Sequence, residues 1–558
     1  MHRRAQSIEE RVAIVVVAAA AILFLVLKLY ALRVVAVGDE HLYFNMAILV
    51  NQGLVPHVDF FYTHPPLHLY LAVWAFKLFG YSLVLGKLIP VCAILVGGLC
   101  VFAIGRRALG ALEGAVAGAI FLLAFDPLRI SSHFTGGSET FGFAMVGLWL
   151  AYSGWPVLAG VAFGLGALVA VYILPGAAAV ALLLMLRAPR QAVRFVAAAA
   201  GVVLAGNGLM YAIAGWDFVY QVYLTQFQKG KEGGLVDYTL YHRLGYIMYE
   251  NRLMTAGSVA GLALLAWEVR TRLGGRWRQI MRDVPGEGLL LFVAWFVLYW
   301  VFFLSISLQH AYYFLFIMPV FAWLSAYAYV AVGRATVGLM RTYTTSSAPA
   351  RSRRAATPSR WAQAAPALVG VLLTLLNVAV LEALYVPFAQ RRYGTGMAQY
   401  PWRPLPGWPT LDAAVRATFW SPSYTTLNPP SGIARYLQHE SEQITATEQI
   451  YAAVRQHTAP TDTIFGDVGF VPLVASETGR RVAANLVDTS SYRISYGLSR
   501  IEDWIADIER DHVRLLVVRQ NSLPMRWPQF LAYAQRTFQT VARIPDPQAG
   551  VFEIMVRK

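Results

Sequence analysis

Long apolar runs separated by short polar connections restrict the fold of this sequence more than any other feature. About eleven runs are long enough, or nearly so, to cross about 30 Å of hydrocarbon as helices. They lie at 12–36, 83–105, 111–126, 139–153, 156–172, 173–187, 194–215, 253–267, 287–306, 309–332 and 362–387. The composition agrees, because 57% of the 558 residues are hydrophobic and only 14% are charged. We therefore predict a mainly α-helical, polytopic membrane bundle of about eleven transmembrane helices.

Clusters of Arg and Lys between these runs predict the orientation in the membrane. If the runs alternate across the bilayer, the clusters all fall on one side, at 3–11, 106–107, 187–194, 270–282 and 334–360. Positively charged connections remain in the cytoplasm, so we expect a multi-pass inner-membrane protein with a cytoplasmic N-terminus and a basic cytoplasmic loop at 333–361. The net charge of +15 is then explained by topology and by anionic headgroups of the lipid bilayer, and nucleic acid is not an expected partner.

The apolar runs also divide the chain into regions. Residues 1–388 form the predicted transmembrane domain, in which 37–82 is a first outer loop. Within that loop the apolar stretch 65–79 is too short to span the bilayer and favours a juxtamembrane or re-entrant helix. The proline- and aromatic-rich region 389–439 is typical of an interfacial collar.

The last region, 440–558, has the pattern of a small extracytoplasmic α/β domain. Helices are predicted at 447–457 and 499–511, and strands at 463–465 and 513–518. Two closing strands, 537–544 and 550–556, are predicted to pair as a hairpin. Helices that alternate with short β-rich runs favour an α/β fold.

The first outer loop contains an unusual concentration of ionisable groups. Between residues 38 and 67 the chain carries Asp39, Glu40, His41, His57, Asp59 and His64. Carboxylates and histidines at the mouth of a transmembrane bundle are costly to retain and indicate a functional site. Capping of a helix would also explain Asp39 and Glu40, but it leaves the histidines without a role. His64 on its own is equally compatible with an ordinary loop histidine before a turn.

Three other outward connections carry polar groups at the same membrane face. They contain Arg129, His133 and Glu139 in the second outer connection, Arg243 in 216–252, and His310 before a late run. Glu139 can be explained as a first-turn acid favoured by the helix dipole. Lys87, Arg129, Arg243 and His310 are each explained by snorkelling to the interface. Taken as a group, these cations are what a phosphate-bearing ligand in the outer leaflet would require.

The order of these features resembles the glycosyltransferase C superfamily, most closely the family of protein O-mannosyltransferases and bacterial aminoarabinose and lipopolysaccharide sugar transferases. The resemblance is carried by Asp39-Glu40 with Tyr43 and Ala47, followed by GLVPHVDFF at 53–61 and HPPL at 64–67. GKLIP at 86–90, GRR at 105–107 and QHAYYFLFIMP at 309–319 support it. It covers about residues 8–335 and does not extend into 440–558, which is expected to recognise the acceptor or to cover the site.

The resemblance implies a membrane glycosyltransferase that takes a sugar from a polyprenyl-phosphate donor and passes it to a protein, lipid or glycan. Asp39 would be the general base, with Glu40 beside it, and Glu139 would be the second acidic position. Inversion in a single displacement needs a base on the acceptor hydroxyl and positive charge on the departing phosphate. The candidate phosphate partners are His64, Lys87, Arg129, Arg243 and His310.

The chain departs from the family pattern immediately before the Pro-Pro pair. Relatives that act on lipid A carry an acid-lysine pair there, whereas this chain has Thr63 and His64. His64 would either replace the lysine at the phosphate or join Asp39 and Glu139 as ligands of a divalent metal ion.

Two other classes of function are also open to such a chain. A transporter or flippase of lipid-linked saccharides would place charges near the bilayer midplane and show internal repeats, whereas the polar groups here gather at one face. A scaffold that binds ligand through 440–558 would leave the first outer loop without a purpose.

Overall fold

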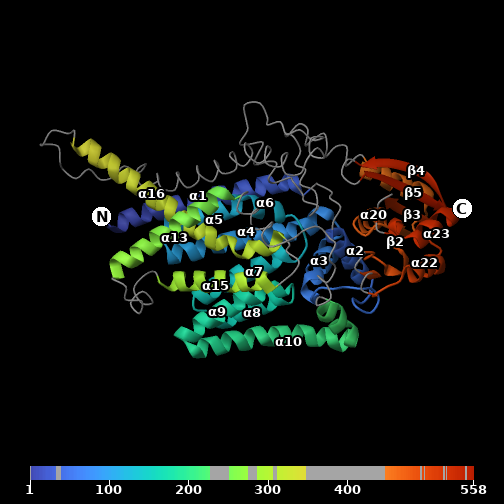
Figure 1. Ribbon diagram of the computed structural model, residues 1–558, viewed down its shortest axis with the longest axis horizontal. Helices are drawn as coiled ribbons and strands as arrows, with labels where there is room; N and C mark the ends of the chain where they lie inside the picture. Colours follow the sequence, from blue (N-terminus) through green and yellow to red (C-terminus); the bar gives the residue numbers. More distant parts are fainter. Residues whose placement is uncertain are drawn as a thin grey trace.

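The protein is a helical bundle with a small sheet-containing domain at one end (Figure 1). The computed structural model describes residues 2–32, 39–225, 251–273, 286–305, 311–346 and 446–558, apart from 491–492, 495–496, 520–521, 523 and 547–549. The predicted collar at 389–439 lies outside the described residues. The fold class expected from the sequence, a mainly α membrane bundle with a small α/β domain, is confirmed.

Each predicted apolar run coincides with helix except 362–387, which lies outside the described residues. The helices are α1 (His2–Ala31), α4 (Leu83–Ala108), α5 (Ala111–Leu123), α7 (Gly137–Tyr152), α8 (Pro156–Ala167), α9 (Leu174–Arg187), α10 (Pro189–Val219), α13 (Arg252–Leu273), α15 (Gly286–Ser305) and α16 (Met318–Ser346). Among the described residues, Leu83–Ala108, Pro189–Leu224 and Met318–Leu339 are long and apolar enough to cross a membrane alone.

The late run at 309–332 is interrupted, because α16 begins only after the 3-10 turn η3 (Ala311–Phe316). The same helix then continues to Ser346, so the first part of the predicted basic loop at 333–361 is helical.

Small residues let the bundle helices approach one another closely. A side chain at Gly114 of α5 would collide with the backbone of Arg106 in α4. Similarly, one at Gly261 of α13 would collide with the backbone of Leu324 in α16. Close backbone approach of this kind is how helices associate where lipid removes the hydrophobic driving force.

Two short helices, α2 (Asp39–Asn51) and α3 (Pro66–Phe79), lie between the bundle and the C-terminal domain (Figure 1). The 14 residues of α3 are fewer than the roughly 20 that a span requires. Aromatic and aliphatic side chains of both helices, including Phe44 and Phe76, pack into one buried cluster. We call residues 39–82, which hold both helices and the connection between them, the α2–α3 segment.

The C-terminal domain is built on a five-stranded sheet in the order β2-β1-β3-β5-β4. Its strands are β1 (Thr463–Gly466), β2 (Arg481–Val482), β3 (Leu515–Arg519), β4 (Phe538–Asp546) and β5 (Gly550–Arg557). β1 is parallel to β2 and β3, whereas β4 and β5 form the predicted antiparallel hairpin. The strands expected at 463–465 and 513–518 are therefore present.

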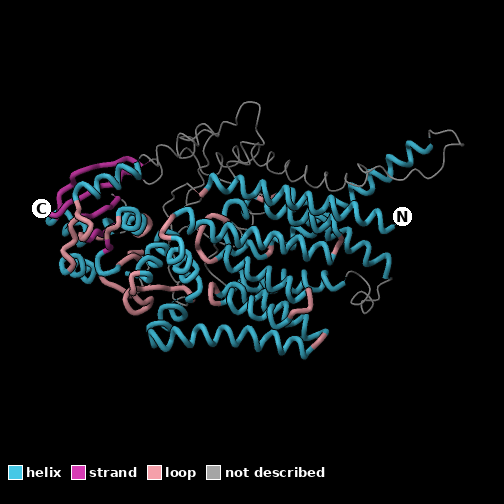
Figure 2. The backbone as a smooth tube through the Cα atoms, turned by 180° about the vertical axis from the view of Figure 1, so that it is seen from behind, coloured by secondary structure: helices cyan, strands magenta, loops and turns pink. Residues whose placement is uncertain are grey.

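Helices surround the strands at the C-terminal end of the molecule (Figure 2), and they pack on both faces of the sheet. The helix at 446–457 and α20 (Val471–Thr478) share one buried cluster with Leu515 and Val517 of β3. α22 (Ile501–Arg510) and α23 (Pro528–Thr537) share another with Leu516 and Val518. Alternate residues of β3 thus enter opposite cores, which explains why this strand is apolar throughout.

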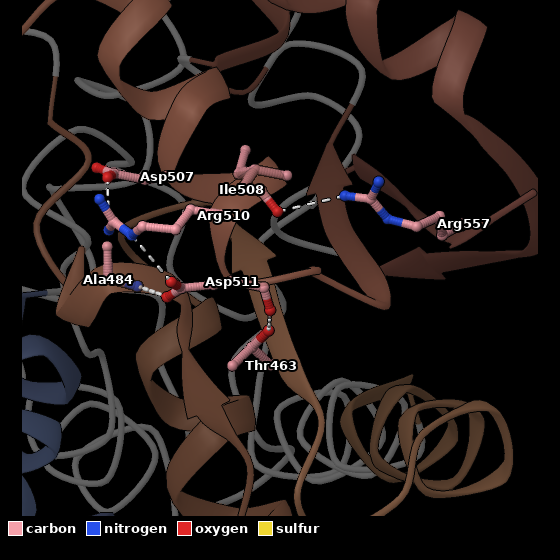
Figure 3. A network of polar contacts seen from close by, with 7 residues as sticks. All are labelled: Thr463, Ala484, Asp507, Ile508, Arg510, Asp511 and Arg557. Atoms are coloured by element: carbon pink, nitrogen blue, oxygen red, sulfur yellow. Dashed lines mark hydrogen bonds and ion pairs between the residues drawn. The ribbon is translucent and has the colours of Figure 1, made fainter.

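A polar network fixes the end of α22 to the sheet (Figure 3). The Asp511 carboxylate accepts a hydrogen bond from the Ala484 amide, and the Asp511 carbonyl accepts one from Thr463 Oγ1 at 2.9 Å. Arg557 of β5 donates to the Ile508 carbonyl at 3.3 Å. The bonds from Thr463 and Arg557 are accepted by carbonyls at the end of α22, where the helix itself provides no further amide partners.

The C-terminal domain packs directly on the α2–α3 segment. Asn45 Nδ2 of α2 donates to the Pro472 carbonyl at 3.3 Å and to Ser476 Oγ at 3.0 Å, both in α20. Tyr81 Oη donates to Glu477 Oε1 at 3.0 Å. α2 therefore lies between the bundle and α20, and its position depends on both.

Candidate active site

The first turn of α2 places Glu40 in a buried ion-paired cluster. Lys87 Nζ, from the first turns of α4, lies 3.0 Å from Glu40 Oε1, and the two side chains are 1% and 2% exposed. His133 Nδ1 lies 3.6 Å from Glu40 Oε2, and His41 Nε2 lies 4.0 Å from Glu40 Oε1. Three separate parts of the chain thus converge on one carboxylate.

This environment keeps the Glu40 carboxylate ionised. Burial by itself raises the pKa of Glu40, but the nearby Lys87 and His133 outweigh it and hold the pKa well below its ordinary value. Burial also lowers the pKa of His133, which is therefore neutral at pH 7. A carboxylate with so low a pKa is a weak base, so Glu40 is better suited to balance charge than to accept a proton.

Asp39 differs from Glu40 although the two are adjacent. It is the first residue of α2 and its side chain is exposed, whereas Glu40 points into the bundle. An exposed carboxylate next to a fixed charge cluster is accessible to an incoming hydroxyl group. Of the two predicted catalytic acids, Asp39 is therefore exposed and Glu40 is buried.

Glu139 is a buried first-turn residue of α7. Among the described residues no Lys, Arg or His forms an ion pair with it, so the helix N-terminus is the main source of favourable potential. Glu139 interacts electrostatically with Glu40 and with Tyr62, which places it within range of the cluster. The dipole interpretation and the second-acid interpretation both remain compatible with this position.

Aromatic and imidazole rings line the connection between α2 and α3. Tyr43 Oη lies 2.8 Å from His64 Nε2, and Tyr62 Oη lies 3.0 Å from His68 Nδ1. The His68 ring stacks on Phe134 with centroids 4.5 Å apart. Tyr43 lies three residues after Glu40, on the same face of α2. Through its contact with Tyr43, His64 is therefore held next to the helix that carries Glu40.

Two buried histidines predict that this segment is acid-sensitive. Burial lowers the pKa of His57 to about 4 and that of His68 to about 3. Below about pH 6.5 the unfolded chain therefore binds more protons than the folded chain. The free energy of unfolding that depends on these two neutral rings is therefore highest above about pH 6.5. It is lost as the pH falls toward the pKa of His57, about 4, and then that of His68, about 3.

We expect the Tm of the purified protein to fall between pH 7 and pH 4, and to fall less in His57→Asn, because asparagine does not take up a proton in this range. Asparagine is chosen because it tolerates the positive φ of this position. Tm measured across that range for both proteins is the check. Parallel curves would show that His57 takes no part.

Solved structures of another protein share the fold of this chain. No family model matches the chain, and no curated protein matches it. The structure of ArnT from Cupriavidus metallidurans bound to undecaprenyl phosphate aligns with a TM-score of 0.58 and 15% identity, covering 97% of each chain. The apo structure of the same protein aligns with a TM-score of 0.57 and 16% identity, again over 97% of each chain. The chain has the same fold as ArnT.

Within this fold, the predicted site residues divide into two sets. Asp39, Glu40, Lys87, His64 and Glu139 lie at the same end of the bundle, on α2, α4, α7 and the connection before α3. Arg129 belongs to α6 (Phe125–Ile130), but its side chain lies outside the described residues, as do Arg243 and His310.

The predicted metal ligands are not gathered into one centre. Among the described residues, no group of three or more His, Cys, Asp and Glu side chains is arranged to hold a metal ion. Within the same residues, His64 is engaged by Tyr43 and Glu139 is a buried helix-start residue. The donor set Asp39, His64 and Glu139 therefore does not fit a metal, and no step below uses one.

The site also contains residues that sequence reasoning passed over. Lys28 of α1 is 0% exposed and its Nζ donates to Ser132 Oγ at 3.4 Å, next to the His133 position. A single lysine within the apolar run 12–36 was the sequence feature that could have identified it. Tyr62 and His68 had no such feature, because their roles depend on contacts made only in the folded chain.

Proposed function

We propose that the protein is an integral-membrane glycosyltransferase that moves a sugar from a polyprenyl-phosphate donor to an acceptor hydroxyl. The observation that carries this proposal is the adjacency of Asp39 and Glu40 at the start of α2. One carboxylate is exposed, and the other is buried against Lys87 at 3.0 Å. Asp39 offers a proton acceptor, and the adjacent Glu40 holds the positive charge of Lys87 nearby, so together they meet the two requirements of a single displacement.

In the proposed reaction Asp39 takes the proton of the acceptor hydroxyl as its oxygen attacks the anomeric carbon. The bond from that carbon to the phosphate oxygen breaks, and the electron pair leaves with polyprenyl phosphate. His64 and Lys87 are proposed to face the phosphate, with Glu40 offsetting much of the cost of burying the Lys87 charge. The product has the opposite anomeric configuration to the donor.

The similarity to ArnT bound to undecaprenyl phosphate supports the donor class. We further infer that α2 and the C-terminal domain face away from the cytoplasm, because the basic clusters lie on connections at the other side. Protease access to a C-terminal tag in intact spheroplasts would test that orientation, and protection of the tag would contradict it.

The activity is tested with the purified protein in liposomes and a panel of undecaprenyl-phosphate-linked sugars. We expect one donor to be consumed with release of undecaprenyl phosphate, and transfer of its sugar, with inversion, to an acceptor in a cell-envelope extract. A lipid-linked sugar that crosses the bilayer with its covalent structure intact would instead identify a flippase. Failure to consume any donor of the panel would contradict the proposal.

A further inference from the structure

The end of α10 has an irregular backbone that presents one glutamine to the α2–α3 segment. Gly215 interrupts the helix with φ 57° and ψ −136°, and the chain continues as the π-helical turn η2 (Tyr220–Leu224). π-helical turns insert a residue into a helix and are frequent at functional sites. Here the turn carries Gln221, which faces residues 57–62 of the α2–α3 segment.

The Gln221 amide uses both of its ends on this segment. Oε1 accepts from the Tyr62 backbone amide at 3.0 Å and lies 3.3 Å from His57 Nδ1, and Nε2 donates to the His57 carbonyl at 3.0 Å. The Tyr62 amide is a donor and the His57 carbonyl an acceptor, so the orientation of the Gln221 amide is fixed. The acceptor at Oε1 also selects the His57 tautomer that carries its proton on Nδ1.

His57 occupies a backbone conformation that needs such support. Its φ of 69° lies in the left-handed region, which residues other than glycine adopt at a cost. The His57 amide closes the turn by donating to the Phe60 carbonyl at 3.0 Å. The His57 ring packs on Phe218, with ring centroids 5.2 Å apart. Strained backbone of this kind persists only where neighbouring groups determine it.

The far side of this turn leads directly to the candidate site. Tyr62, whose amide Gln221 holds, lies against His64 with ring centroids 5.9 Å apart and against Tyr43 at 6.3 Å. Its hydroxyl lies 3.0 Å from His68 Nδ1. A short, continuous set of contacts therefore connects Gln221 to the imidazole proposed to face the donor phosphate.

We propose that Gln221 is a positioning residue, which fixes the 57–62 turn and thereby places Tyr62 and His64 for the phosphate of the donor. The part that concerns the donor rests on the proposed function. Gln221 contacts no reacting atom in this scheme and acts through Tyr62. A role confined to stability would change the Tm without changing the affinity for the lipid phosphate.

Two substitutions test how much the hydrogen bonds of the Gln221 side-chain amide contribute to holding the 57–62 turn. Gln221→Leu removes all three hydrogen bonds, whereas Gln221→Glu keeps an acceptor for Tyr62 and His57 but places a carboxylate oxygen where Nε2 donates to the His57 carbonyl. The matched control is Gln191→Leu, because Gln191 is an exposed glutamine near the start of α10, the helix that leads into η2. Two measurements are made on each full-length protein in detergent: hydrogen exchange of the Tyr62 amide, and the Kd for undecaprenyl phosphate by native mass spectrometry.

We expect Gln221→Leu to accelerate Tyr62 amide exchange and to weaken undecaprenyl phosphate binding by about tenfold or more, since small misplacements at a site cost up to about 10²-fold. Gln221→Glu should fall between the wild type and Gln221→Leu, and Gln191→Leu should match the wild type. Unchanged exchange, or faster exchange with an unchanged Kd, would overturn the inference. Absence of undecaprenyl phosphate binding by the wild type would instead refute the proposed function, and with it the donor-facing role of Gln221.

Discussion

Replacing Asp39 with asparagine is expected to reduce sugar transfer by about 10²–10⁴-fold, the range attributed to a positioned general base. Asparagine has nearly the same shape but cannot accept the acceptor proton at neutral pH. Because the Asp39 side chain is exposed, its replacement should leave the Tm close to that of the wild type. Initial rates with the donor identified from the lipid-linked panel, together with the Tm, provide the measurement.

Asp59→Asn is the matched control, because Asp59 is an exposed aspartate of the same segment. Its Oδ2 accepts from the Val55 amide at 2.7 Å, a bond that asparagine can also accept. Normal transfer by Asp39→Asn, with the control also normal, would remove Asp39 from the reaction. Equal losses in both variants would indicate that the segment as a whole, and not the Asp39 carboxylate, is sensitive.

Of the substitutions at Lys87, Glu40 and Arg106, Lys87→Ala is expected to lower the free energy of unfolding most. Lys87→Ala leaves the Glu40 carboxylate buried without the ammonium that lies 3.0 Å away, and such a loss typically costs about 3–5 kcal/mol of unfolding free energy. The double variant Glu40→Gln with Lys87→Met removes both charges while largely keeping the side-chain volumes, so it should be more stable than Lys87→Ala. Denaturation in mixed detergent micelles gives the comparison.

The same helix provides the control for this experiment. Arg106, also on α4, pairs with Glu10 at 2.9 Å, but these two side chains are 46% and 51% exposed. Exposed pairs contribute about 0–1 kcal/mol, so Arg106→Ala should have a small effect. Equal losses in Arg106→Ala and Lys87→Ala would contradict the assignment of Lys87 to a buried charge cluster.

The helices of the bundle were predictable because a lipid environment leaves a simple record in the sequence. Runs of apolar residues must be helical where no water can satisfy the backbone, so their positions are found from composition alone. The β4–β5 hairpin was predictable for a similar local reason. By contrast, α20, β2 and α23 were not anticipated, since each is short and owes its stability to the core that it covers.

The candidate site was predictable only as far as single residues have a local signature. Asp39, Glu40 and His64 stand out because ionisable groups are rare in this half of the chain. Their division into an exposed carboxylate and a buried, paired one depends on the rotation of α2 against α4, which no sequence period specifies. Gln221 could not be predicted for the same reason, because its hydrogen-bond partners are backbone groups 159 and 164 residues away in the chain.

The bonds from Asn45 to α20 also determine when the protein is complete. They join residues 427 and 431 positions apart in the chain. At about 5–20 residues per second, a ribosome needs on the order of 20–85 s to synthesise the chain from α2 to α20, which packs on it. During that interval the helix with Asp39 and Glu40 is already made while the surface that will hold its outer side does not yet exist. A chain that ends before α20 thus inserts its bundle but never acquires a fully supported site.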